Sequence, residues 1–87
     1  MNGGLAMTTT DAFVNADAPG AVAITFNGVP RCVSTGMTLA ALIHRLGRTP
    51  ASVATSVNGR FVPRGERESV VLQGGDEIAC FEPIVGG

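Results

Sequence analysis

The sequence of 87 residues has no lysine, no tryptophan and no tyrosine, one histidine and two cysteines. Without lysine, Schiff-base chemistry on a side-chain amine is excluded. One histidine and two cysteines that form no C-x-x-C pair are too few for a zinc site or a four-thiolate iron–sulfur cluster, so we expect no bound metal. No apolar stretch approaches the ~18 residues of a membrane-spanning helix, and we expect no membrane partner.

Charge of either sign is also scarce. Six basic residues, all arginine, stand against seven acidic residues and leave a formal charge of −1. The arginines are scattered and form no basic stripe, so nucleic acid is not an expected partner. A chain this short buries only about 60% of its unfolded surface and has no room for a deep pocket. We therefore expect a function on the surface or at a terminus, and not a self-contained enzyme.

The few residues capable of reactive chemistry are interpreted as structural. Cys32 and Cys80 each lie in an apolar segment and are expected to be small, half-buried hydrophobic residues in a reducing cytoplasm. Their sequence positions leave a single disulfide open. His44 has no evident orienting partner, which argues against a Ser/His/Asp arrangement, and we interpret it as a solvated helix residue.

The chain divides near residue 20. Residues 1–20 are rich in Thr, Asn, Asp, Ala and Gly and lack the basic and apolar regions of a secretory signal. We predict a flexible N-terminal tail over residues 1–20 and a single domain over residues 21–87.

The first half of the domain predicts a hairpin followed by a helix. Residues 21–26 alternate with period two, Asn27-Gly28 is typical of a type I′ turn, and residues 29–34 form the return strand, with Cys32 on the face opposite Val33. Thr38 is placed to cap a helix, and Gly47 to end it. The helix has one apolar stripe: Leu39, Leu42, Ile43 and Leu46.

The second half predicts three more strands. The alternation of Val53, Thr55 and Val57 predicts a strand over residues 53–57, and Asn58-Gly59 predicts a turn after it. Residues 60–62 are predicted to form a short return strand that ends at Pro63. We predict a charged surface loop over residues 64–69, a return to the core at residues 70–72, and a last strand over residues 77–82. Ile78 and Cys80 share one face of that strand, and Ala79 and Phe81 share the other. Two hairpins around one helix favour an α+β domain with the helix on one face of a sheet.

The C-terminus carries the reactive group. The chain ends Ile84-Val85-Gly86-Gly87, directly after the last strand. The terminal carboxylate is ionised at neutral pH and can attack the α-phosphorus of ATP when an enzyme supplies nucleotide and Mg²⁺. Glycine lacks a Cβ, so this tail can thread a narrow channel and leaves the activated carbonyl of Gly87 open to a nucleophile.

Residues 21–87 resemble the ThiS family of sulfur carrier proteins. The most specific similarity is the run Val-Asn-Gly-x-x-Val-Pro-Arg at residues 57–64. The others are Phe26-Asn27-Gly28, Gly36-Met37-Thr38-Leu39, Gly75-Asp76 and the terminal Gly86-Gly87. One departure is Gly65-Glu66-Arg67-Glu68, where relatives often carry an aromatic residue.

The resemblance implies a β-grasp (ubiquitin-like) fold whose last strand is central and parallel to the first. It also implies a cytoplasmic carrier with no catalysis and no bound cofactor of its own. A ThiF-like enzyme would use ATP and Mg²⁺ to adenylate Gly87, and a cysteine-derived persulfide would convert it to a thiocarboxylate. Thiazole synthase, ThiG, would then receive the sulfur. Ile84, Val85 and Gly86 would thread into the partner.

We further expect Ala79 and Phe81 to form a partner-docking patch, with Cys32 on the same face. Three alternatives remain open. The small subunit of molybdopterin synthase shares the fold and the Gly-Gly terminus, although the Val-Asn-Gly/Val-Pro-Arg pairing fits the thiazole family better. A ubiquitin-like protein modifier could not build chains on itself through lysine. A plain β-grasp interaction module would not need Gly86 and Gly87.

Overall fold

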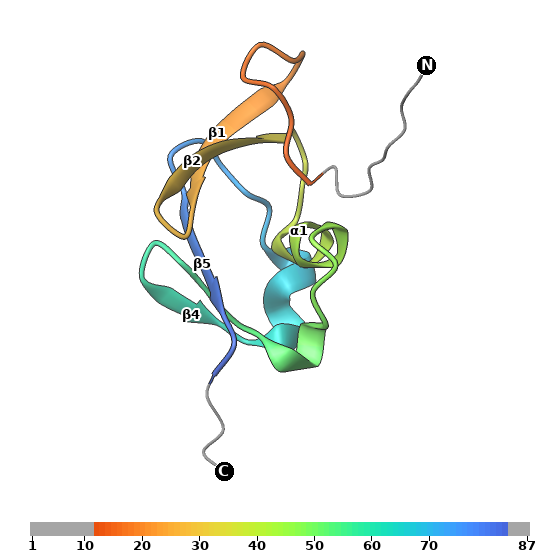
Figure 1. The fold of residues 1–87 in the computed structure, drawn as a ribbon, viewed down its shortest axis with the longest axis vertical. Coiled ribbons are helices and arrows are strands. Elements are labelled where there is room, and N and C mark those ends of the chain that lie inside the picture. Colours follow the sequence, from red (N-terminus) through yellow and green to blue (C-terminus); the bar gives the residue numbers. More distant parts are fainter. Residues whose placement is uncertain (1–11, 84–87) are drawn as a thin grey trace, which may run out of the picture.

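The computed structural model describes residues 12–83, which form one sheet with a single main helix against one face (Figure 1). This confirms the predicted α+β arrangement. The strands are β1 (Ala21–Phe26), β2 (Val29–Ser34), β3 (Ala54–Val57), β4 (Arg60–Val62) and β5 (Glu77–Phe81). The helix is α1 (Leu39–Arg45), and two 3₁₀ helices follow it, η1 (Pro50–Ser52) and η2 (Arg64–Ser69).

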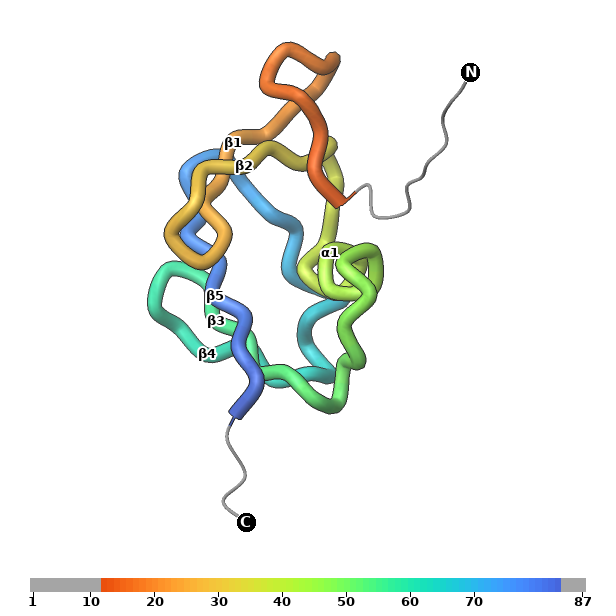
Figure 2. The backbone as a smooth tube through the Cα atoms, viewed as in Figure 1, coloured from red at the N-terminus to blue at the C-terminus, as the bar shows by residue number. Residues whose placement is uncertain are grey.

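The sheet has the strand order β2-β1-β5-β3-β4, with the last strand of the sequence in the middle (Figure 2). β5 runs parallel to β1 and antiparallel to β3, and the two hairpins flank this central pair. The topology is the one that the family resemblance implies. A parallel β1–β5 pair needs a long crossover, and α1, the β3–β4 hairpin and η2 all lie within it.

Both Asn-Gly turns form as predicted. Asn27 has a φ of 51° and Gly28 of 81°, and the second turn repeats this geometry with 54° at Asn58 and 81° at Gly59. Positive φ at both central residues defines the turn whose twist matches that of a hairpin. The turns set the strand registers, Phe26 opposite Val29 and Val57 opposite Arg60.

The predicted helix signals are also confirmed. The Thr38 hydroxyl accepts a 3.1 Å hydrogen bond from the backbone N–H of Ala41, and Gly47, with a φ of +75°, follows the helix end. A helix of two turns is not stable alone in water and depends on its buried face. Three of its four stripe residues, Leu39, Leu42 and Ile43, are buried against the sheet.

Packing against the core begins before β1. Ala12 is a buried core residue, and Phe13 packs on Phe26 with 5.8 Å between ring centroids. The backbone N–H of Val14 donates to the carbonyl of Cys32 and extends the sheet beyond β2. Residues 12–14, which fall within the predicted flexible tail over residues 1–20, therefore pack against the sheet through hydrophobic contacts and a β-bridge, while the flexibility of the tail stays a prediction. Residues 1–11 lie outside the described residues.

The predicted loop over residues 64–69 is a 3₁₀ helix, η2. Its predicted surface position is confirmed for all its residues except Arg67, which is only 3% exposed. The expected return of residues 70–72 to the core is wrong for one of them: Leu72 is buried and Val70 half-buried, whereas Val71 is exposed.

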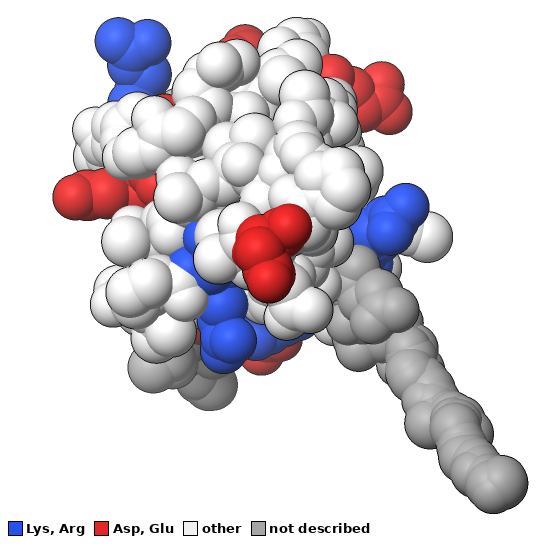
Figure 3. Space-filling view, turned by 90° about the horizontal axis from the view of Figure 1, so that it is seen from above, with Lys and Arg blue, Asp and Glu red and all other residues white. Residues whose placement is uncertain are grey.

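The surface carries charges of both signs. In Figure 3 one group of basic side chains lies low on the face with acidic atoms at its edge, and the other acidic and basic side chains are scattered over mostly uncharged surface. Among residues 12–83, no helix is long and apolar enough to cross a membrane.

Candidate functional site

β5 leads to the C-terminus, which the sequence predicts to be reactive, and it is held on both sides. Where the pairing of β1 with β5 ends, the Asn27 side chain makes the hydrogen bonds to β5 that a neighbouring strand would make. Its Oδ1 accepts from the Cys80 N–H at 2.9 Å, and its Nδ2 donates to the Cys80 carbonyl at 3.0 Å. On the other side, β3 pairs antiparallel with β5, with Val57 opposite Ile78 at one end and Ala54 opposite Phe81 at the other. The start of the C-terminal tail therefore has a fixed position in the sheet.

The second Asn-Gly turn fixes the other end of the same strand. Asn58 accepts from the Glu77 N–H at 2.9 Å and donates to the Asp76 carboxylate, also at 2.9 Å. Asp76 in turn accepts from the N–H of Gln73. Each hairpin thus contributes an asparagine side chain that anchors one end of β5, a role that hairpin propensity alone does not indicate.

No segment between residues 12 and 83 covers the sheet face away from α1 near the end of β5. As predicted, Ile78 and Cys80 point into the core, while Ala79 and Phe81 point outward; Ala79 is half-buried and Phe81 is 54% exposed. Register places Ala54 beside Phe81 and Ser56 beside Ala79. Cys32 pairs with Ala23 and lies on this same sheet face, two strands from β5.

Sequence reasoning missed one residue of this surface. Phe61 pairs with Ser56, so it shares the outer face with Ala79, and it is 63% exposed. The sequence did carry a signal for it: side chains alternate between the two faces of a strand, so with Val62 in the core its neighbour Phe61 points outward. We define the outer-face patch as Ala54, Ser56, Phe61, Ala79 and Phe81. All five side chains are uncharged, and the two aromatic rings project from β4 and β5.

The chain leaves this patch through two exposed residues, Glu82 and Pro83. Glu82 lies 3.7 Å from the Arg48 guanidinium, with both side chains partly exposed, so this ion pair contributes at most about 1 kcal/mol. The predicted reactive residue Gly87 and the predicted threading residues Ile84, Val85 and Gly86 lie outside the described residues.

The cysteines form no disulfide. Cys80 is buried on the inner face, and burial raises the pKa of its thiol, which disfavours the reactive thiolate. Cys32 is half-buried and belongs to the opposite face. His44 is exposed near the end of α1. Between residues 12 and 83 no three His, Cys, Asp or Glu side chains are grouped as metal ligands.

The comparisons with known proteins agree with this arrangement. The model of the ThiS family matches residues 24–87, which include β5 and the terminal Gly-Gly. The chain belongs to the ThiS family. It is 33% identical over 64 residues to the sulfur carrier protein ThiS of Escherichia coli (strain K12), a match that covers 74% of this chain and 97% of that relative.

A solved structure shows the same fold. The crystal structure of the thiamine biosynthesis protein ThiS from Geobacter metallireducens superposes with a TM-score of 0.68 at 22% sequence identity. The match covers 76% of this chain and all of that one. The β-grasp architecture expected for the family is thereby confirmed, while residues 12–23, with their packing on β2, precede the part matched by the family model.

Proposed function

We propose that this ThiS-family chain is the sulfur carrier for formation of the thiazole ring of thiamine, with Gly87 as the carrier residue. The observation that carries the proposal is the family match, which runs through β5 to residue 87. The sulfur carrier from Escherichia coli, 33% identical, supports the same role. The central position of β5 adds a physical reason, since it presents the tail from a rigid strand.

The proposed chemistry takes place at the terminal carboxylate. One carboxylate oxygen of Gly87 attacks the α-phosphorus of ATP, and pyrophosphate leaves. The outer sulfur of a cysteine persulfide on the donor then attacks the acyl carbonyl and expels AMP, which leaves Gly87 joined to the donor cysteine through an acyl disulfide. A second thiol attacks the sulfur of the donor cysteine, so that the thiocarboxylate leaves and the donor cysteine and this thiol are joined in a disulfide. ATP and Mg²⁺ belong to the adenylating partner, a ThiF-like enzyme. The carrier contributes an unhindered carbonyl, because Gly87 has no Cβ.

The outer-face patch is proposed as the surface that docks the adenylating enzyme. It is uncharged and bears two exposed phenylalanines, Phe61 and Phe81, and it lies where β5 leads toward the tail. Aromatic side chains of this kind carry much of the binding energy in protein interfaces. Docking there would bring the tail and the partner's nucleotide site together.

We propose ThiG as the acceptor of the sulfur and the cytoplasm as the compartment.

Intact mass after incubation with ATP, the adenylating enzyme and a sulfur donor tests the carrier role. We expect the mass increase that corresponds to replacement of one oxygen by sulfur. A variant lacking Gly87 should show no increase. An unchanged mass in the full chain, or the same increase without Gly87, would contradict the proposal. Sulfur transfer to thiazole synthase, compared with the pterin enzyme, then separates the thiazole role from the molybdopterin alternative.

The docking surface is tested separately by Phe81→Arg and Phe61→Arg. Each is expected to weaken binding to the adenylating enzyme at least about tenfold, because a hot-spot aromatic is worth on the order of 2 kcal/mol. Val71→Arg is the matched control, since Val71 is similarly exposed but lies outside the strands. Circular dichroism should show an intact fold for all three. Unchanged affinity of both phenylalanine variants would remove the patch from the interface without affecting the carrier role.

A further inference from the structure

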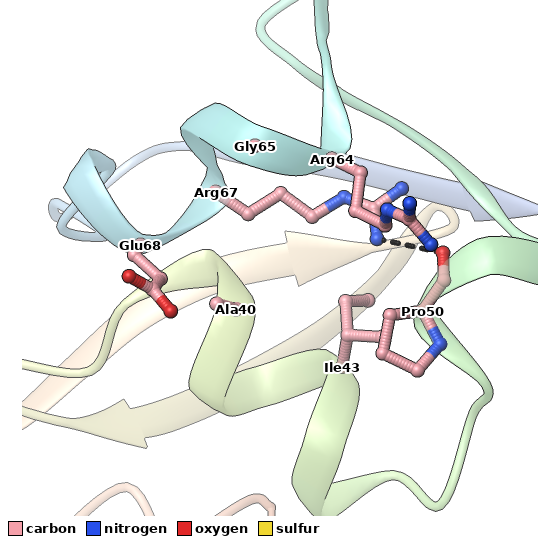
Figure 4. A pocket seen from close by; sticks show the side chains of 7 residues that line it. All are labelled: Ala40, Ile43, Pro50, Arg64, Gly65, Arg67 and Glu68. Carbon is pink, nitrogen blue, oxygen red and sulfur yellow. Dashed lines mark hydrogen bonds between the residues drawn. The ribbon is translucent and has the colours of Figure 1, made fainter.

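A cavity of about 260 Å³ lies on the helix side of the domain, between α1, η1 and η2. Ala40 and Ile43 of α1 and Pro50 of η1 supply apolar walls (Figure 4). Arg64 and Arg67 of η2 line it as well. The proposed docking surface makes no use of this cavity, because the outer-face patch lies on the other face of the sheet.

Arg67 is the unusual residue of this cavity. Only 3% of its surface is exposed, although its guanidinium carries five N–H donors that need acceptors. Three of its N–H groups are used: Nε donates to the Thr55 hydroxyl at 3.0 Å, Nη1 to the Pro50 carbonyl at 3.0 Å and Nη2 to the Val53 carbonyl at 2.7 Å. These bonds hold the guanidinium in one orientation at the cavity.

The charge of Arg67 is not neutralised by these contacts. Among residues 12–83 the one ion pair is Arg48–Glu82, so no described carboxylate lies within 4.0 Å of Arg67. A guanidinium has five N–H groups, and two of those of Arg67 have no described acceptor. A buried, unpaired charge is costly, and an anion beside it relieves that cost.

A second guanidinium reinforces the positive end of the cavity. In Figure 4 the Arg64 side chain extends toward Pro50, at the same end as the head group of Arg67, whereas Glu68 lies at the opposite end beside Ala40. The cavity therefore has a positive end, apolar walls and a negative end. Two negative charges on one ligand would bring one of them toward Glu68.

We propose that this cavity binds a small organic carboxylate with a single negative charge. The carboxylate would accept hydrogen bonds from the free N–H groups of Arg67 and from Arg64, a geometry that suits planar guanidinium and carboxylate groups. A short apolar body would lie against Ala40 and Ile43. The proposal is independent of the sulfur carrier function.

An NMR titration of the ¹⁵N-labelled full chain with butyrate tests this site, with chloride at matched ionic strength as the reference. We expect saturable shifts of the Arg67 Nε–H signal and of the Ala40 and Gly65 amides, and weaker binding of inorganic phosphate. Shifts that rise linearly without saturation, or that chloride reproduces, overturn the proposal. Tighter binding of phosphate than of butyrate overturns the assignment to a carboxylate.

Three variants separate the site from general charge effects and leave Arg67, which supports η2, in place. Arg64→Gln should weaken butyrate binding about threefold to fivefold, since a partly exposed ion pair is worth up to about 1 kcal/mol. Arg45→Gln removes one exposed charge outside the cavity and should leave binding unchanged. Ala40→Leu should fill the cavity and abolish binding at unchanged charge. Equal affinity in Ala40→Leu and the parent chain would show that butyrate does not enter the cavity.

Discussion

The two faces of the sheet differ in what covers them. The inner face, formed in part by Ile24, Phe26 and Ile78, is packed beneath α1 and contributes to a continuous core. The outer face carries small residues and two exposed phenylalanines, Phe61 on β4 and Phe81 at the end of β5. In this small carrier, stability and partner binding are therefore assigned to different surfaces: the inner face stabilises the fold, and the outer face is proposed to bind the partner.

The largest effect is expected from removal of a core side chain. Leu42 is fully buried between α1 and the sheet. Leu42→Ala should lower the free energy of unfolding by about 2–5 kcal/mol, the cost of lost burial plus a cavity. Chemical denaturation measures this change. A loss below about 1 kcal/mol would mean that α1 contributes little to the core and would break the comparison between the faces.

A smaller effect is expected from the asparagine anchors of β5, which form a matched pair. Asn27→Ala and Asn58→Ala both place alanine at positive φ, so the strain is common to both. Asn27 also loses two part-buried hydrogen bonds to Cys80, whereas the bonds of Asn58 are exposed. The unfolding free energy should therefore fall by about 0.5–1.5 kcal/mol more for Asn27→Ala. Equal losses would show that burial of these bonds adds nothing.

Alkylation of the two cysteines reports on both faces in one experiment. At pH 8 iodoacetamide should modify half-buried Cys32 at least about tenfold faster than buried Cys80. Peptide mapping of the folded protein measures the two rates. Faster reaction at Cys80 would contradict its assignment to the inner face.

The raised pKa of Cys80 also makes the free energy of unfolding depend on pH. Above about pH 8.5 the thiol ionises in the unfolded chain while it stays protonated in the folded one, so the free energy of unfolding falls as pH rises toward the folded pKa. Cys80→Ala should lack this part of the decline. Identical pH profiles of the two proteins above pH 8 would contradict the assignment.

The smallest effect on stability is expected on the outer face. Phe61→Ser and Phe81→Ser should each change the unfolding free energy by less than about 1 kcal/mol, because both rings are more than half exposed in the free protein. Thermal or chemical unfolding provides the comparison with Leu42→Ala. A loss similar to that of Leu42→Ala would mean that these rings stabilise the fold and would remove the contrast between the faces.

Much of this architecture follows from local sequence. Asn27-Gly28 and Asn58-Gly59 specify the turn type by their backbone preference, and the turn then fixes which strand residues face each other. Thr38 and Gly47 delimit α1 in the same local way. The alternation in β5 also predicts correctly that Ala79 and Phe81 face outward. These features depend on neighbours within a few residues, which a sequence displays directly.

Other features depend on contacts between distant parts of the chain. The burial of Ala12 needs a core assembled from later elements, so the composition of residues 1–20 gave no sign of it. Arg67 is buried because carbonyls of the η1–β3 segment surround its guanidinium, which a charged stretch of sequence cannot show. Phe61 joins the patch only through the pairing of β4 with β3 and of β3 with β5.

The sequence by itself determined the turns, the helix limits, the alternation of the strands and the chemistry available at Gly87, because each depends on covalent structure or on short-range backbone preference. The tertiary structure decided which charge is buried, which residues before β1 pack on the core and which aromatic residues share a face. Those outcomes depend on the solvent exposure of each group, and exposure is a property of the assembled chain.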